Sequence, residues 1–100
     1  MEKIKIALAD DEELFLNGLK TILDNDPKTE VLLTADDGDE LLEKLEQTSN
    51  LPDIVLLDLR MKKMDGVATT EQLKTLYPQI KIIILSSHYR ESFLGYMFKL

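Results

Sequence analysis

Two short apolar segments, each followed directly by aspartate, decide the fold. They are IKIALA (Ile4–Ala9), followed by Asp10 and Asp11, and DIVLL (Asp53–Leu57), followed by Asp58. A short apolar run that stops at a polar residue and precedes a helical pattern is typical of a buried β-strand. If these two strands are parallel neighbours, their carboxyl ends lie at the same edge of a sheet. The sequence therefore predicts that three carboxylates meet there.

The rest of the chain alternates between strand and helix patterns. Glu30–Ala35 and Ile80–Leu85 predict two further strands, the first more exposed because it carries Glu and Thr, the second almost wholly apolar. Alternation of this kind predicts an α/β fold, a doubly wound parallel sheet with helices on both faces. In such sheets ligands bind beyond the carboxyl ends of the strands, where Asp10, Asp11 and Asp58 are placed.

Helices are predicted between the strands from apolar residues at helical spacing and from start and stop signals. Asp37-Gly38-Asp39 is typical of a loop and N-cap, and Met64-Asp65-Gly66 of a turn into a helix. Pro27 and Pro78 end two of the helices, and Tyr89–Leu100 predicts a last one. The predicted buried faces are Phe15, Leu19, Ile22 and Leu23; Leu41, Leu42 and Leu45; Val67, Thr70, Leu73 and Leu76; and Phe93, Met97 and Leu100.

Composition restricts the function classes. A chain of 100 residues with 44% apolar residues predicts a single folded domain over residues 1–100. The net charge of −7 and the scattered basic residues make this chain unsuited to gripping DNA. It has no cysteine, which excludes disulfides and thiolate metal sites. No apolar run approaches the ~20 residues that span a bilayer, and no signal peptide is evident, so we expect a cytoplasmic protein without a membrane partner.

The three aspartates predict a site for a hard cation. Crowded carboxylates repel one another unless a positive charge lies among them. Mg²⁺ prefers oxygen ligands and often binds phosphate oxygens as well, so the arrangement indicates chemistry on a phosphoryl group. Acidic residues also favour the first turn of a helix, where they cap free N–H groups. That structural explanation is reasonable for each aspartate alone and weaker for all three together.

Three motifs in order resemble one known family across the whole chain. ALADDEE (Ala7–Glu13), IVLLDLRMKKMDG (Ile54–Gly66) and IIILSS (Ile82–Ser87) are similar to the receiver domain of bacterial two-component response regulators. The resemblance implies a flavodoxin-like, CheY-like sheet of order 2-1-3-4(-5). The stretches around the first and last motifs resemble the NarL/FixJ subfamily, which implies a LuxR-type helix-turn-helix output domain that binds DNA and lies outside this chain.

The resemblance also implies roles for individual residues. Asp58 would be the phosphoacceptor, taking a phosphoryl group from a sensor histidine kinase. The Mg²⁺ cofactor would be held by the carboxylates and by the backbone carbonyl of Arg60. Ser86 would contact the phosphoryl group, and Gly66 would permit a tight turn through its conformational freedom. The implied metal site is Asp10, Asp11, Asp58 and Arg60.

Two departures from the family pattern matter. Lys62 stands where receivers usually have proline, which should loosen the loop after Asp58. A fifth strand and a fifth helix, with a phosphoryl-contacting lysine, are missing from this chain. Their absence would leave the edge of Ile80–Leu85 unpaired, so we expect a homodimer or an exchanged strand through that edge. We also expect a poor conformational switch, since one of the two phosphoryl contacts is lost.

Two other functions are open from the sequence. An aspartate-nucleophile phosphohydrolase of the haloacid-dehalogenase type needs a second aspartate two residues after the nucleophile, and that position is Arg60. A phosphorylation-independent interaction module is disfavoured by the intact Asp10, Asp11, Asp58 and Ser86. We therefore expect a phosphoacceptor that does not turn over a substrate as an enzyme does.

Overall fold

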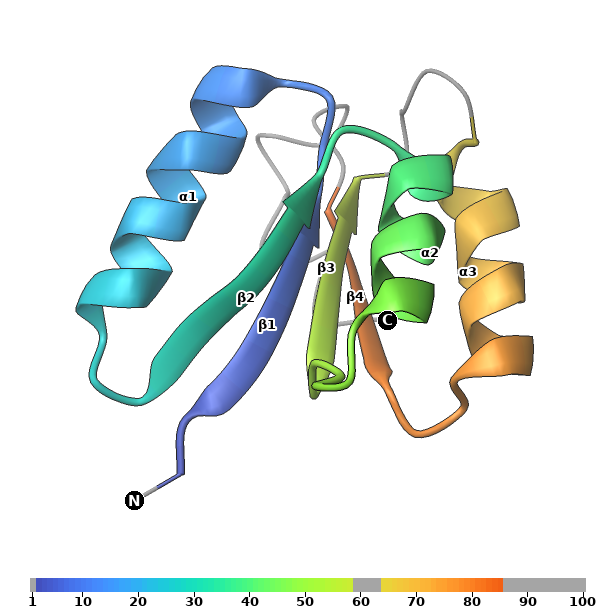
Figure 1. The fold of residues 1–100 in the computed structure, drawn as a ribbon. Coiled ribbons are helices and arrows are strands. Elements are labelled where there is room, and N and C mark those ends of the chain that lie inside the picture. Colours follow the sequence, from blue (N-terminus) through green and yellow to red (C-terminus); the bar gives the residue numbers. More distant parts are fainter. Residues whose placement is uncertain (1, 59–63, 86–100) are drawn as a thin grey trace.

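A parallel sheet in the order β2-β1-β3-β4 forms the centre of the molecule in a computed structural model, which describes residues 2–58 and 64–85 (Figure 1). This confirms the predicted α/β fold and strand order. The elements follow the chain as β1 (Ile4–Ala9), α1 (Glu13–Asn25), β2 (Thr29–Ala35), α2 (Gly38–Gln47), β3 (Ile54–Asp58), α3 (Gly66–Leu76) and β4 (Lys81–Leu85). The predicted helix over Tyr89–Leu100 lies outside the described residues.

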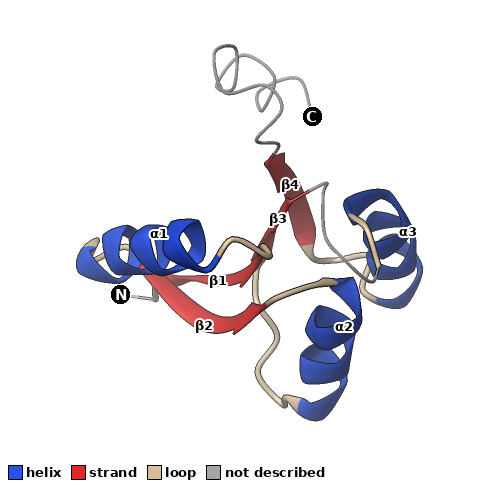
Figure 2. Cartoon of the chain, turned by 90° about the horizontal axis from the view of Figure 1, so that it is seen from above, coloured by secondary structure: helices blue, strands red, loops and turns tan. Residues whose placement is uncertain are grey.

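Helices cover the sheet from both sides. α1 lies on one face and α2 and α3 lie together on the other (Figure 2). The larger core cluster joins α2 and α3 to the sheet through Leu41, Leu45, Leu73, Val55 and Leu57. A smaller cluster joins α1 to the opposite face through Ile6, Leu8 and Leu16. Alternate residues of β1 and β3 therefore enter different clusters, as the two-residue period of a strand requires.

The predicted helix faces are right for α2 and wrong in part for α1. Leu41 and Leu45 are buried, as expected. In α1, however, Phe15 and Ile22 are exposed, and the residue that enters the core is Leu16. Leu19 and Leu23 pack beside Leu16, at the i, i+3, i+7 spacing of one helix face. Phe15 and Ile22 are apolar residues that flank this stripe, so the sequence did not identify which face of the helix is buried.

The predicted face of α3 is also wrong in part. Leu73 is buried, but Val67 and Leu76 are more than half exposed. Thr69, which the sequence did not single out, is completely buried. Its hydroxyl donates to the backbone oxygen of Asp65 at 2.7 Å, one helical turn earlier. This bond satisfies the polar atom, so a threonine can replace an apolar side chain at the contact.

The two edge strands differ from the central pair. The residues of β2 are mostly half-exposed, which confirms the exposed position expected for this strand. β4 pairs with β3 from Ile54↔Lys81 to Asp58↔Leu85, and the homodimer or strand exchange expected at its other edge stays a prediction. Among the described residues, no helix is long and apolar enough to cross a membrane.

Replacing the N-cap of α3 should have a modest effect on stability. Asp65 Oδ1 accepts a hydrogen bond from Ala68 N at 2.9 Å. Asp65→Ala should lower the free energy of unfolding by about 1 kcal/mol, the typical loss for an N-cap carboxylate. Asp65→Asn keeps the acceptor and should lose less than half of that. Urea denaturation of the three proteins measures the difference, and equal losses for both variants would contradict the capping role.

Candidate functional site

The site lies at the carboxyl ends of the two central strands. β1 and β3 pair in parallel, with Ala9 opposite Leu57. Asp10 follows directly on β1, and Asp58 is the last residue of β3. Both strands end at the upper rim of the sheet in Figure 1, and from the end of β1 the chain turns toward α1. The topology therefore brings together residues that are far apart in the sequence.

The three aspartates form one cluster, as predicted. Each of Asp10, Asp11 and Asp58 offers a carboxylate oxygen, and the three oxygens lie within 4.8 Å of one another. Asp58 is 3% exposed and Asp10 is 6% exposed, whereas Asp11 is half-buried. One buried carboxylate would be unusual in a small domain, and two that face each other are costly unless they bind a positive group.

Burial and negative charge raise the pKa of Asp10 to about 6, above the ordinary 3.8. Desolvation is the larger cause, and the charges of Asp58, Glu12 and Asp11 add to it. One contact opposes the shift, because Asp10 Oδ1 accepts a hydrogen bond from Glu12 N at 2.8 Å. The structural reading of Asp10 as a residue that caps free N–H groups is thus partly correct. Burial of the ionised Asp10 carboxylate also costs free energy, and a capping role does not require such burial.

The donor set fits a hard divalent cation. Three carboxylate oxygens from two adjacent strand ends are the ligand type that Mg²⁺ and similar ions prefer. A cation among them would offset both the repulsion and the desolvation that raise the pKa of Asp10. The half-buried position of Asp11 leaves one side of the cluster accessible. The site can therefore take a metal ion together with an anionic ligand such as a phosphoryl group.

Met64, which lies shortly before α3, is hydrogen-bonded to the start of α2. Gly38 N, at the start of α2, donates a hydrogen bond to Met64 O at 3.3 Å. A Cβ on Gly38 would lie 1.9 Å from Thr69 Oγ1 and 2.9 Å from Met64 O, so only glycine fits there. In the sequence, Gly38 is recognisable only as part of an N-cap signal, and Thr69 has no signal of its own. No local pattern signals a close approach between two helices.

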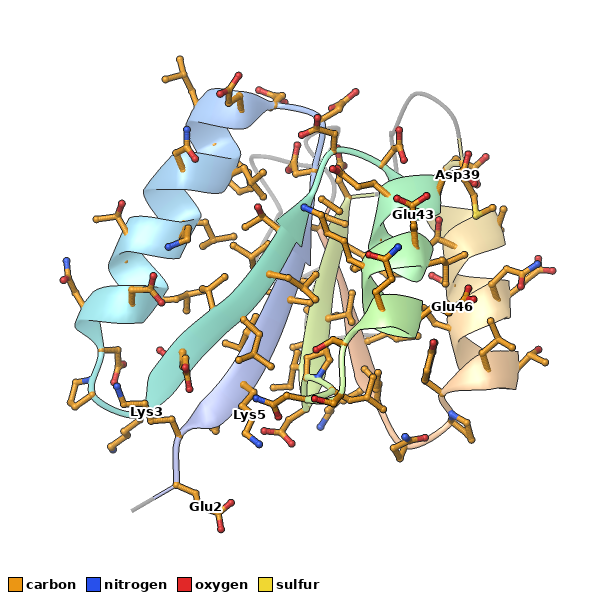
Figure 3. The ribbon with its side chains drawn as sticks, viewed as in Figure 1. Glu2, Lys3, Lys5, Asp39, Glu43 and Glu46 are labelled. Atoms are coloured by element: carbon orange, nitrogen blue, oxygen red, sulfur yellow. The ribbon has the colours of Figure 1, made fainter. Side chains whose placement is uncertain are left out.

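A second group of acidic residues is separate from this cluster. Asp39, Glu43 and Glu46 lie on the exposed surface of α2 (Figure 3). Lys3 and Lys5 lie near the start of β1, at the opposite end of the sheet from the three aspartates (Figure 3). Asp39, Glu43 and Glu46 are exposed to solvent, whereas Asp10 and Asp58 are the buried carboxylates among the described residues.

The remaining predicted site residues are placed as follows. Arg60 and Ser86 lie outside the described residues, so their roles stay predictions. Gly66 is buried and begins α3, and no described glycine has a positive φ. Gly66 therefore does not adopt a left-handed backbone angle, and its expected role in the turn stays a prediction. Its backbone oxygen accepts a hydrogen bond from Thr70 Oγ1 at 2.6 Å.

Comparison with known proteins agrees with the fold. Residues 6–99 match the sequence model of the family described as response regulator receiver domain. The transcriptional regulatory protein DegU of Brevibacillus brevis is 38% identical over 97 residues, which cover 97% of this chain and 40% of DegU. A protein-glutamate methylesterase/protein-glutamine glutaminase of Oceanobacillus iheyensis is 37% identical over 87 residues, covering 87% of this chain and 24% of that protein.

A solved structure gives the same result for the fold. The signal receiver domain of the putative response regulator NarL from Mycobacterium tuberculosis superposes with a TM-score of 0.78 at 29% identity, covering 99% of this chain and 78% of that one. The chain spans about two fifths of DegU and a quarter of the methylesterase. Both relatives match through the same segment, although their names describe different activities.

Proposed function

Because the chain belongs to the response regulator receiver family, we propose that residues 1–100 are a phosphoacceptor domain in which Asp58 takes a phosphoryl group from a sensor histidine kinase. The observation that carries this proposal is the cluster itself: Asp58 is almost fully buried at the end of β3, and one of its oxygens lies within 4.8 Å of one oxygen of Asp10 and one of Asp11. In the proposed role this carboxylate attacks the phosphorus atom, and correct positioning of the reacting groups is the main contribution a protein makes to phosphoryl transfer.

In the proposed reaction an Asp58 oxygen forms a bond to phosphorus while the bond between phosphorus and the phosphohistidine nitrogen breaks. The imidazole leaves with the electron pair of that bond, and an aspartyl phosphate remains. Asp10 and Asp11, with Asp58 and the Arg60 carbonyl, would hold Mg²⁺, which supplies positive charge next to the transferring group. The proposed role of Ser86 is a hydrogen bond to a phosphoryl oxygen once Asp58 is modified.

For the parent protein we propose a transcriptional output. The relative with the higher coverage of this chain is named a transcriptional regulatory protein, which favours a LuxR-type helix-turn-helix domain that binds DNA outside this chain. The net charge of −7 agrees with DNA binding by another domain. The methylesterase relative supports a second candidate, a receiver that controls a catalytic domain. In both cases we propose a cytoplasmic protein, with the histidine kinase as its upstream partner.

Phosphorylation of Asp58 is tested by intact-mass spectrometry after incubation with Mg²⁺ and acetyl phosphate. We expect an adduct of one phosphate on the parent chain and none on Asp58→Asn, because the amide is not a nucleophile. Asp53→Asn is the matched control, since Asp53 lies just before the opposite end of β3 and its acceptor role toward Lys5 N is kept. An adduct on both parent and Asp58→Asn would show that another group reacts.

Two further outcomes distinguish the remaining alternatives. No adduct on any variant, with a native circular dichroism spectrum, would overturn the phosphoacceptor proposal and favour a phosphorylation-independent interaction module. Sustained release of phosphate from a phosphate ester would instead favour a phosphohydrolase.

Chelation of Mg²⁺ by EDTA should prevent formation of the phosphate adduct on the parent chain, because the three carboxylates then repel the incoming phosphoryl group.

A further inference from the structure

The outer edge of β2 has backbone groups that β1 does not use. Ile4 N donates to Lys28 O at 2.8 Å, and Asp10 N donates to Ala35 O at 3.0 Å. In a parallel strand, the backbone N–H and C=O groups of every second residue point to the same neighbouring strand. Lys28 and Ala35 are an even and an odd residue, so both can point to β1 only if the alternation shifts once between them. The shift occurs opposite Ile6 and Ala7, where Leu32 is passed over in the pairing. Residues 29 and 31 face outward before it, and residues 34 and 36 after it.

Side chains of α1 bond to the first part of this edge. Asp24 Oδ1 accepts a hydrogen bond from Val31 N at 3.0 Å, and its other oxygen is 2.8 Å from Lys20 Nζ. These two contacts, Lys20 first, hold the pKa of Asp24 below its ordinary value. Thr29 N donates to Asp26 O at 3.2 Å within the turn that joins α1 to β2. We call Asp24 and Lys20 the α1 clasp.

Side chains of α2 bond to the second part. Lys44 Nζ donates to Thr34 O at 2.6 Å and lies 3.5 Å from Glu40 Oε2. The other oxygen of Glu40 accepts a hydrogen bond from Asp36 N. We call Lys44 and Glu40 the α2 clasp. Each clasp is an i, i+4 ion pair on its own helix, so its two members hold each other in place.

We propose that the two clasps close the outer edge of β2 against strand addition by a second copy of this chain. Outward N–H and C=O groups on an edge strand are a template for another strand. Here Val31, Thr34 and Asp36 already have side-chain partners on both sides of the shift at Leu32. The clasps flank a groove of about 550 Å³ whose floor includes Val31, Leu32 and Leu33, apolar residues that another β2 would cover.

The occupant excluded by this arrangement is another β2 in particular. A second copy presents the same half-exposed apolar residues, so two edges could pair about a two-fold axis with matching surfaces. The shift at Leu32 adds a local twist that also disfavours regular pairing. No member of either clasp belongs to the aspartate cluster, so closure of this edge does not depend on phosphorylation of Asp58.

The test opens both clasps in the full chain with Asp24→Ala and Lys44→Ala together. Glu71→Ala with Lys74→Ala is the matched control, since it removes one exposed acid and one exposed base from α3 without touching β2. A spin label on Leu32→Cys, introduced into a chain without cysteine, reports contact between two β2 edges. We expect dipolar broadening that increases with protein concentration in the opened variant, and no broadening between β2 labels in the parent or the control.

Native-state hydrogen exchange provides an independent measurement on milder variants. Asp24→Ala alone should speed exchange of the Val31 amide, and Glu40→Ala that of Asp36, each by about fivefold to tenfold at low protein concentration, as expected for the loss of one hydrogen bond. Core amides such as Val55 should be unchanged. If the opened variant shows neither β2 contact nor faster exchange, the clasps do not guard this edge. Broadening between β2 labels in the parent chain would also overturn the proposal.

Discussion

In the absence of divalent cations, Asp10→Asn should raise the free energy of unfolding by about 2 kcal/mol at pH 8. A pKa of about 6 in place of 3.8 corresponds to roughly 3 kcal/mol of penalty on the ionised carboxylate in the folded state. Asparagine has nearly the same shape, carries no charge and can still accept the hydrogen bond from Glu12 N. Part of the gain is lost because an amide is also costly to bury.

The gain from Asp10→Asn should depend on pH in a defined direction. Because the folded-state pKa of Asp10 is raised, the folded protein binds more protons than the unfolded chain between pH 3.8 and about 6. Stability of the metal-free parent therefore falls as pH rises through this window, and the full penalty applies above it. The difference between parent and variant should shrink as pH falls from 6 toward 4. Urea denaturation at several pH values measures this difference.

Mg²⁺ should reverse the order of stability. The parent should gain stability with added Mg²⁺, because the ion binds the folded cluster and not the unfolded chain, whereas Asp10→Asn should respond much less. Asp39→Asn is the matched control, since it removes the same charge from an exposed position on α2 and should change stability by less than about 0.5 kcal/mol. A metal-free Asp10→Asn protein less stable than the parent at pH 8 would contradict the electrostatic account of the site.

Gly38→Ala should destabilise the protein by about 3 kcal/mol, near the upper end of the usual range for overpacking. The added Cβ would lie 1.9 Å from Thr69 Oγ1 and 2.9 Å from Met64 O. Thr69 is completely buried and its hydroxyl already donates to Asp65 O, so it has little room to move. Separation of α2 from Met64 would also break the hydrogen bond from Gly38 N. Thermal and urea denaturation measure the loss.

Gly18→Ala is the control for the same substitution in a different environment. Gly18 is in the middle of α1, and an added Cβ would meet nothing within 4 Å. Alanine should therefore stabilise the helix by about 0.5 to 1 kcal/mol. In a Thr69→Ala background the cost of Gly38→Ala should decrease, since the closest contact is gone. If Gly38→Ala lowers the free energy of unfolding by the same amount in that background, the steric conflict is with Met64 and not with Thr69.

The local pattern was sufficient to predict the described strands and helices and the cluster of three aspartates. Strands ending at Asp10 and Asp58 are nearly continuous apolar runs, and a run of that kind can be covered only between two helix layers. Because β1 and β3 are parallel neighbours, the three carboxylates that follow or end them must lie at the same edge of the sheet. Strand order 2-1-3-4 came from the family resemblance, and the observed sheet confirms it.

Contacts between elements were decided only by the tertiary structure. Helical periodicity predicted that Phe15 and Val67 are buried, but packing against neighbouring elements buries Leu16 and Thr69 instead. The close approach of Gly38 to Thr69, the bonds from Asp24 and Lys44 to β2, and the raised pKa of Asp10 all depend on residues distant in the sequence. Sequence alone determined which chemical groups reach the site, because strand ends fix their positions. Burial and neighbouring charge set the protonation of Asp10, and these exist only in the folded chain.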